Sequence, residues 1–113
     1  MTTIYKMCLQ GQWHEADQAG AFKGAVIDQR DDFIHFSTAH QVTETARLHF
    51  AGVSDLVLIA VDGDALGDAL RWEASRGGAL FPHLYGPLPM SAVRSVAPLP
   101  IGPDGQHVFP ADL

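Results

Sequence analysis

The apolar residues of the chain form short runs that predict strands. Ile4–Leu9 mixes β-branched, aromatic and aliphatic residues around one lysine and stops at Gln10-Gly11, which is typical of a strand. Asp55–Val61 contains an unbroken apolar run that is too short for a buried helix, so it predicts a central strand covered on both faces. Leu70–Ala74 and Val93–Leu99 are two further predicted strands.

Helical spacing of apolar residues is clearest from Thr38 to Phe50. Thr38 and Gln41 have the spacing of a capping box, which fixes the start of this helix. The segment Phe33–Phe36 is a predicted strand that leads directly into it. A shorter helix is predicted over His14–Ala19, where Gly20 follows as a stop signal.

Two prolines set the expected place of the segment Phe81–Leu88. A proline cannot donate a hydrogen bond to a neighbouring strand, so it is normally excluded from the middle of a sheet. Because this segment contains Pro82 and Pro87, we expect it to form a sheet edge, a bulge or an ordered loop.

The length and charge of the chain limit the classes of function. With 113 residues, 47% of them hydrophobic, the chain fits one domain spanning residues 1–113. Seven basic residues against thirteen acidic ones give a net charge of −6. A nucleic-acid backbone would be repelled by such a surface, so we expect no nucleic-acid partner. A small anionic ligand held by one or two arginines remains compatible with this charge.

The N-terminal residues, the cysteine and the histidines indicate the expected location and metal binding. Met1–Lys6 lacks the basic start and long apolar run of a signal peptide, and no window of the chain is apolar enough to span a membrane. We therefore expect a cytoplasmic protein with no membrane partner. Cys8 is interpreted as a small buried hydrophobe, and the histidines do not show the spacing of metal ligands. The oligomeric state is not indicated.

Residues with catalytic or binding chemistry gather in two segments, Phe33–Gln41 and Arg71–Pro87. In the first segment, a helix N-terminus follows the strand and offers free amides to an anion. In the second, residues two apart on an extended chain share a face, which pairs Arg71 with Glu73 and His83 with Tyr85. The candidate catalytic residues are Glu73, His35 and His83, and the candidate ligand-binding residues are Ser37, Thr38, Arg71, Arg76 and Tyr85.

Each of these candidates also has a structural interpretation. Thr38 can be only a helix cap, His35 only a core histidine bonded to backbone, and Arg71 with Glu73 only a surface ion pair. The test between the two interpretations is geometric, because a functional site requires the side chains to converge on one pocket.

The two segments also carry a family resemblance. Phe33–Thr38 with Gln41, and Phe81–Gly86, resemble the two signature stretches of the domain of unknown function 952 family. The resemblance extends over nearly the whole chain, including Ile4–Lys6 and the strand from Leu56. It implies an α+β fold similar to the ADP-ribosyltransferases, with a mixed, split β-structure and two or more helices.

This resemblance makes NAD a candidate cofactor. Phe36-Ser37-Thr38 is similar to the aromatic-Ser-Thr strand that borders the nicotinamide pocket of ADP-ribosyltransferases. Their first strand contributes a His or Arg that Ile4–Lys6 lacks, so that role would fall to His35, His83 or Arg71. Glu73 would stand in place of their catalytic glutamate, although its surroundings differ from their motif.

Three functions follow as hypotheses. The first is a binding domain for a small anionic ligand of nucleotide or NAD type, without catalysis. The second is an NAD-dependent enzyme, resembling an ADP-ribosyltransferase or a glycohydrolase, in which Glu73 stabilises the ribosyl cation. The third is a structural or protein-interaction domain. The sequence does not decide whether the protein is an enzyme.

Overall fold

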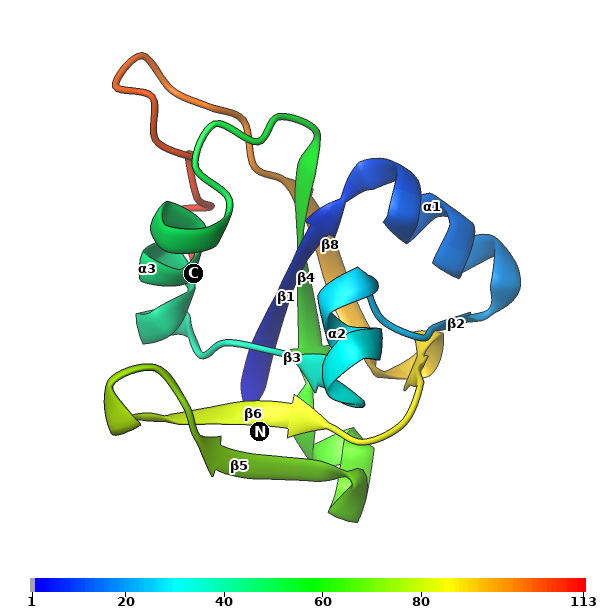
Figure 1. The fold of residues 1–113 in the computed structure, drawn as a ribbon. Coiled ribbons are helices and arrows are strands. Elements are labelled where there is room, and N and C mark those ends of the chain that lie inside the picture. Colours follow the sequence, from blue (N-terminus) through cyan, green and yellow to red (C-terminus); the bar gives the residue numbers. More distant parts are fainter. Residues whose placement is uncertain (1) are drawn as a thin grey trace.

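Strand β4 (Leu56–Asp62) lies at the centre of the largest sheet of the computed structural model, which describes residues 2–113 (Figure 1). Its neighbours are β1 (Thr3–Leu9) and β8 (Val93–Pro98). The residues of β4 alternate between two cores, with Val57 and Ile59 in one and the intervening Leu58 in the other. The prediction of a central strand covered on both faces is therefore confirmed.

Helices cover the two faces of this sheet (Figure 1). Helix α3 (Ala39–His49) packs Val42 and Ala46 against one face, together with Phe109 and Leu113 near the chain end. Helix α1 (Gln10–Ala19) packs Trp13 and Ala16 against the other. Helix α3 has the predicted position, whereas α1 begins before the predicted His14. Of the described helices, none combines the length and the apolar composition needed to cross a bilayer.

A second sheet crosses below the first and consists of β3 (Ile34–His35), β6 (Leu80–Leu84) and β5 (Leu70–Ala74), in that order (Figure 1). A third pairs β2 (Ala21–Phe22) with β7 (Leu88–Pro89). The remaining elements are the helix α2 (Val26–Asp31) and the 3₁₀ segments η1 (Gly63–Ala69), η2 (Arg76–Gly78) and η3 (Met90–Ala92). Together they form a compact single α+β domain.

The expectation of a mixed β-structure is wrong for the part of the chain that the structure describes. Every pair of named strands is antiparallel. The short link η2 joins β5 to β6 as a tight turn, and a parallel pair would require a much longer crossover. The split into separate small sheets and the presence of more than two helices agree with the expected α+β class.

Pro82 lies in the central strand of the second sheet, which corrects the expectation of an edge, bulge or loop. In a strand, the nitrogen and the carbonyl of one residue point to the same side. The Pro82 carbonyl faces β3 and accepts the Phe36 N–H at 3.0 Å, so the Pro82 nitrogen also faces that side. Because that side is the β3 side, the missing N–H removes no bond between β5 and β6, and β3 itself ends at His35, before Phe36.

The segment after β3 joins the two larger sheets. Ser37 donates its N–H to the Tyr5 carbonyl at 2.9 Å, and Tyr5 donates its N–H to the Ser37 carbonyl at 2.8 Å. The Gln41 side chain then accepts the Thr38 N–H at 3.0 Å and donates to the Leu80 carbonyl at 2.8 Å. The start of α3 is thus tied to β6, and this junction positions the site.

Candidate functional site

His35 is held between two carboxylates of helix α2. Its Nδ1 lies 2.6 Å from Asp28 Oδ1, and its Nε2 lies 3.0 Å from Asp31 Oδ2. Ionised carboxylates only accept hydrogen bonds, so the ring can satisfy both partners only when both of its nitrogens carry hydrogen. Both ring nitrogens of His35 therefore have a carboxylate partner.

Asp28 is the hub of a buried polar cluster. Its side chain is fully buried, and its two oxygens lie 2.9 and 2.8 Å from Lys6 Nζ. It also accepts the backbone N–H groups of His35 and Ala25, at 3.0 and 2.8 Å. Burial alone would raise the pKa of Asp28, but the His35 and Lys6 hydrogen bonds outweigh it and lower the pKa to about 2. Asp28 is therefore ionised.

Glu73 and Tyr85 orient His83 from the other side of the site. Glu73 Oε1 lies 2.8 Å from His83 Nδ1 and accepts the Tyr85 hydroxyl at 2.8 Å. These two bonds lower the pKa of Glu73, so it is a carboxylate and His83 Nδ1 is the donor. Arg71, whose predicted partner was Glu73, lies over the Tyr85 ring at 5.4 Å from its centre.

Phe33 fills the space between these two groups. Its ring stacks on His83 with 4.1 Å between ring centres, and it lies 4.5 Å from the His35 ring. The two imidazole rings are 5.6 Å apart. His35 and His83, one from each of the two segments that carry the candidate residues, therefore lie side by side.

A cavity of about 320 Å³ opens beside both histidines. Its walls come from β1, α2, the segment 35–37, α3, the start of η2 and β6. The lining residues are Tyr5, Lys6, Met7, Ile27, His35, Phe36, Ser37, Thr45, His49, Phe50, Ser75, Arg76, Phe81 and His83.

One ring nitrogen of His83 is free. The residue is only 5% exposed, and its Nδ1 is used by Glu73. Among the described residues, no side-chain nitrogen or oxygen is both fully buried and without a hydrogen-bond partner. Nε2 has no partner among these residues, so it retains some accessible surface, and His83 is one of the residues that line the cavity.

The structure brings together some of the sequence-predicted residues and separates others. His35, His83, Ser37 and Arg76 line the cavity. Glu73 and Tyr85 lie behind His83 and act on the cavity only through it.

Arg71 and Thr38 also lie outside the cavity. Arg71 is exposed on β5, and Thr38 is the N-cap of α3. The structure therefore agrees with the interpretation of Thr38 as a helix cap.

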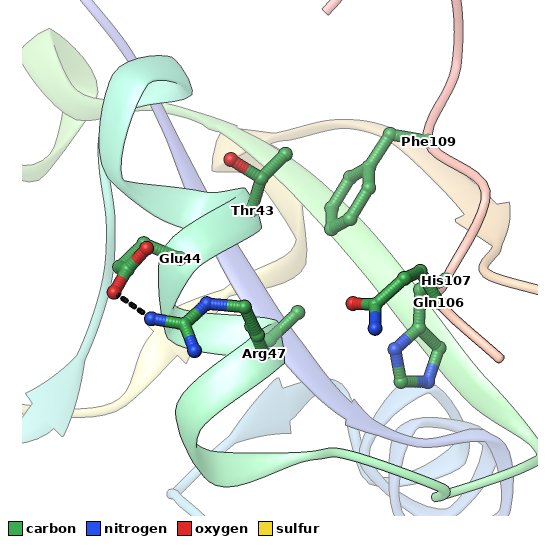
Figure 2. Close-up of a pocket in the computed structure, with 7 residues that line it drawn as sticks. Thr43, Glu44, Arg47, Gln106, His107 and Phe109 are labelled. Carbon is green, nitrogen blue, oxygen red and sulfur yellow. Dashed lines mark hydrogen bonds and ion pairs between the residues drawn. The ribbon is translucent and has the colours of Figure 1, made fainter. Parts of the chain in front are cut away.

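A second cavity, of about 220 Å³, lies between α3 and the C-terminal segment (Figure 2). Arg47 is paired with Glu44 there, and His107 Nε2 lies 2.8 Å from the Val53 carbonyl, to which it donates. None of the sequence-predicted site residues lines it. The charged groups at this position already have partners, so the cavity beside His83 is the candidate site.

Sequence reasoning missed Lys6, Asp28 and Asp31. The signal for Lys6 was present: a lysine in an apolar strand, on the same face as the buried Ile4 and Cys8, requires a buried carboxylate as partner. Nothing local identified Asp28 as that partner. Within residues 2–113, no group of three or more His, Cys, Asp or Glu is arranged to hold a metal ion.

Solved structures with the same fold are known. The crystal structure of protein CC0527 from Caulobacter crescentus is 47% identical, with a TM-score of 0.91 over 95% of this chain and 94% of that chain. The solution NMR structure of the same Caulobacter protein is 48% identical, with a TM-score of 0.84 over 94% and 91% of the two chains. No protein with a curated description is significantly similar.

A family model described as "Protein of unknown function (DUF952)" matches residues 7–96, a stretch that contains all of the cavity residues except Tyr5 and Lys6. The sequence resemblance in the two signature segments is thereby confirmed at the level of the family. With this match, and with a relative that is 47% identical over 95% of this chain, the chain belongs to the DUF952 family.

Proposed function

We propose that the domain binds a small anionic ligand of nucleotide type in the cavity beside His83. The main support for this proposal is the composition of the cavity walls. Five of the fourteen lining residues are Lys, Arg or His, and none is Asp or Glu. This contrasts with the chain as a whole, whose net charge is −6. A cavity wall that has basic side chains and no carboxylate favours an anion and disfavours a cation.

Arg76 is the group best able to hold the anion. Its Nη1 donates to Thr45 Oγ1 at 3.3 Å, and its guanidinium lies 5.0 Å from the centre of the Phe81 ring. No carboxylate of the described residues is within ion-pair distance of it. By contrast, Lys6 and His35 are neutralised by Asp28 and Asp31. Most donors of Arg76 thus remain for a phosphate or carboxylate.

The apolar part of the cavity wall can bind a ring of the ligand. Phe36, Phe50, Phe81, Met7 and Tyr5 give the cavity aromatic and thioether surface. A flat ring such as a nucleobase can pack on these groups while its phosphate contacts Arg76. The cavity volume is at the lower end of the range for ligand sites, which favours a mononucleotide. The resemblance to ADP-ribosyltransferases adds NAD to the ligands to be tested.

Binding is favoured over cleavage of a glycosidic bond by the position of Glu73. Such cleavage develops positive charge on the sugar, which a carboxylate at the reacting centre must stabilise. Glu73 does not line the cavity, and its Oε1 is bound by His83 and Tyr85. The NAD-dependent enzyme hypothesis therefore has less support than the binding hypothesis.

The test is a protein-observed NMR titration with AMP and, separately, NAD. We expect shifts at cavity residues and a loss of affinity of about tenfold or more in Arg76→Gln, because one charged contact is removed. Arg94→Gln is the matched control, since Arg94 lies on β8 and is bonded to Asp62 and Ser91. Absence of shifts at the cavity, or equal affinity for the wild type and Arg76→Gln, would reject the proposal.

A further inference from the structure

The state of His83 is that of a general base. Glu73 accepts from Nδ1, which leaves the lone pair of the neutral ring on Nε2, and His83 is one of the residues that line the cavity. The ring is held on a second side by Phe33, stacked at 4.1 Å. The catalytic base of acyl hydrolases combines two features: an imidazole that a carboxylate orients, and a free ring nitrogen directed at the substrate. His83 has the first feature, and its free nitrogen can supply the second.

We propose that this cavity hydrolyses a carboxylic ester of a small anionic molecule, with His83 as the catalytic base and Glu73 as its positioning residue. The proposal rests on the proposed function, because the anion held at Arg76 is what places the ester beside Nε2. The substrate class is an O-acyl ester that carries a phosphate or carboxylate group.

The sign of the charge in the cavity selects the class of reaction. Addition of water to an ester carbonyl develops negative charge on oxygen, which the Arg76 guanidinium in the cavity wall favours. Cleavage of an N-glycosidic bond develops positive charge, which the same guanidinium would oppose. An anionic transition state therefore suits these walls, whereas a ribosyl cation does not.

The orientation of the imidazoles favours acyl over phosphoryl transfer. Two other imidazoles line the cavity: that of His35 has both nitrogens bonded to carboxylates, and that of His49 lies on α3, whereas the His83 ring is the one that a single carboxylate orients as a base. In phosphoryl transfer, the attacking and leaving oxygens lie on opposite sides of phosphorus, beyond the reach of one base. At a carbonyl carbon, one imidazole can serve both oxygens in turn.

The proposed step is balanced with water as the only co-reactant. Nε2 takes a proton from water as the water oxygen forms a bond to the carbonyl carbon, which gives a tetrahedral oxyanion and an imidazolium. The oxyanion then re-forms the carbonyl, the bond to the leaving oxygen breaks, and Nε2 returns the proton to that oxygen. The products are a carboxylic acid and an alcohol, and His83 is neutral again. Glu73 stabilises the imidazolium that exists between the formation of the tetrahedral oxyanion and its breakdown.

The probe is AMP acetylated on a ribose hydroxyl, with release of acetate and AMP followed by NMR. We expect turnover above the buffer rate in the wild type and a fall of about a hundredfold or more in His83→Gln. Arg94→Gln should keep the wild-type rate. In Glu73→Gln, we expect a fall of about tenfold or more and a shift of the acid limb of the pH profile to lower pH, because the imidazolium loses its carboxylate.

The Glu73→Gln profile keeps the proposal testable even if His83→Gln fails to fold, since Glu73 is on the surface of β5. Full turnover in folded His83→Gln, or an unshifted acid limb in Glu73→Gln, would overturn the proposal. So would AMP binding at the cavity without ester hydrolysis, a result that leaves the proposed function intact. Absence of both binding and hydrolysis would reject both.

Discussion

Lys6 and Asp28 form an ion pair in the interior of the domain, with Lys6 Nζ 2.9 and 2.8 Å from the two carboxylate oxygens. The side chains are 6% and 0% exposed. Both charges have been removed from water, so each depends on the other for compensation. The pair also connects the core to the site, because Asp28 is bonded to His35.

We expect Asp28→Asn to destabilise the domain by about 3–5 kcal/mol, because it leaves the Lys6 ammonium buried without a counter-charge. The free energy of unfolding in urea at neutral pH measures this. The double variant Lys6→Met/Asp28→Asn should be more stable than Asp28→Asn, since no uncompensated charge remains. If the double variant is no better than the single one, the cost does not come from the buried charge.

The pH dependence of stability should carry the signature of Asp28. Its pKa is about 2 in the folded protein and ordinarily 3.8, so the unfolded chain binds more protons between these values. Stability from this group is therefore present above about pH 4 and lost as pH falls toward 2, by about 2 kcal/mol.

The check is the unfolding free energy at pH 5 and at pH 2 for the wild type and Asp28→Asn. Glu73 and Glu44 also have lowered pKa values and contribute to the wild-type decrease. The decrease should nevertheless be smaller in Asp28→Asn. Equal decreases in the two proteins would show that Asp28 titrates normally when folded.

Gly24 should not accept a side chain. Its φ is +109°, and a Cβ added to it would lie 2.8 Å from Asp28 Cβ, so both the backbone and the buried carboxylate would be disturbed. We expect Gly24→Ala to cost about 2 kcal/mol or more. Gly20→Ala is the matched control: φ is +89° but nothing lies within 4 Å, so only the backbone cost of about 1 kcal/mol applies. Equal costs would mean that the contact with Asp28 is unimportant.

Cys8 should be unreactive while the protein is folded. Burial raises the pKa of its thiol to about 11, and the thiolate is the reactive form. We expect an aromatic disulfide reagent at neutral pH to label the native protein about a hundredfold or more slowly than the urea-unfolded chain. Comparable rates in the two states would contradict the buried position.

The elements that the sequence predicted well are those whose signal is local. Asp55–Val61 was identified as a central strand from its own apolar run, and the helix after Thr38 from its own periodicity and cap. The two segments that were identified as rich in candidate residues contain His35 and His83, whose rings lie 5.6 Å apart in the structure. Pro82 was misplaced because its tolerance depends on the length of the neighbouring β3, which no local pattern shows.

The partners of the site residues depended on long-range pairing. The same-face rule correctly put Arg71 with Glu73, and His83 with Tyr85. Strand register, however, sets Arg71 opposite His83, so that Glu73 is the diagonal neighbour of His83 and binds it instead of Arg71. The Lys6–Asp28 pair joins β1 to a short helix that the sequence analysis did not predict, and only the tertiary structure shows it.

The reciprocal hydrogen bonds between Tyr5 and Ser37 join two sheets at a point where both residues also line the cavity. Two backbone amides thus lie between the ligand site and the interior of the domain. Their deuterium uptake measures how often the two sheets separate at this seam. A ligand that fits the cavity without moving the sheets slows that uptake, and a ligand that separates the sheets speeds it up. The exchange rates of these two amides therefore distinguish the two ways in which a ligand can bind.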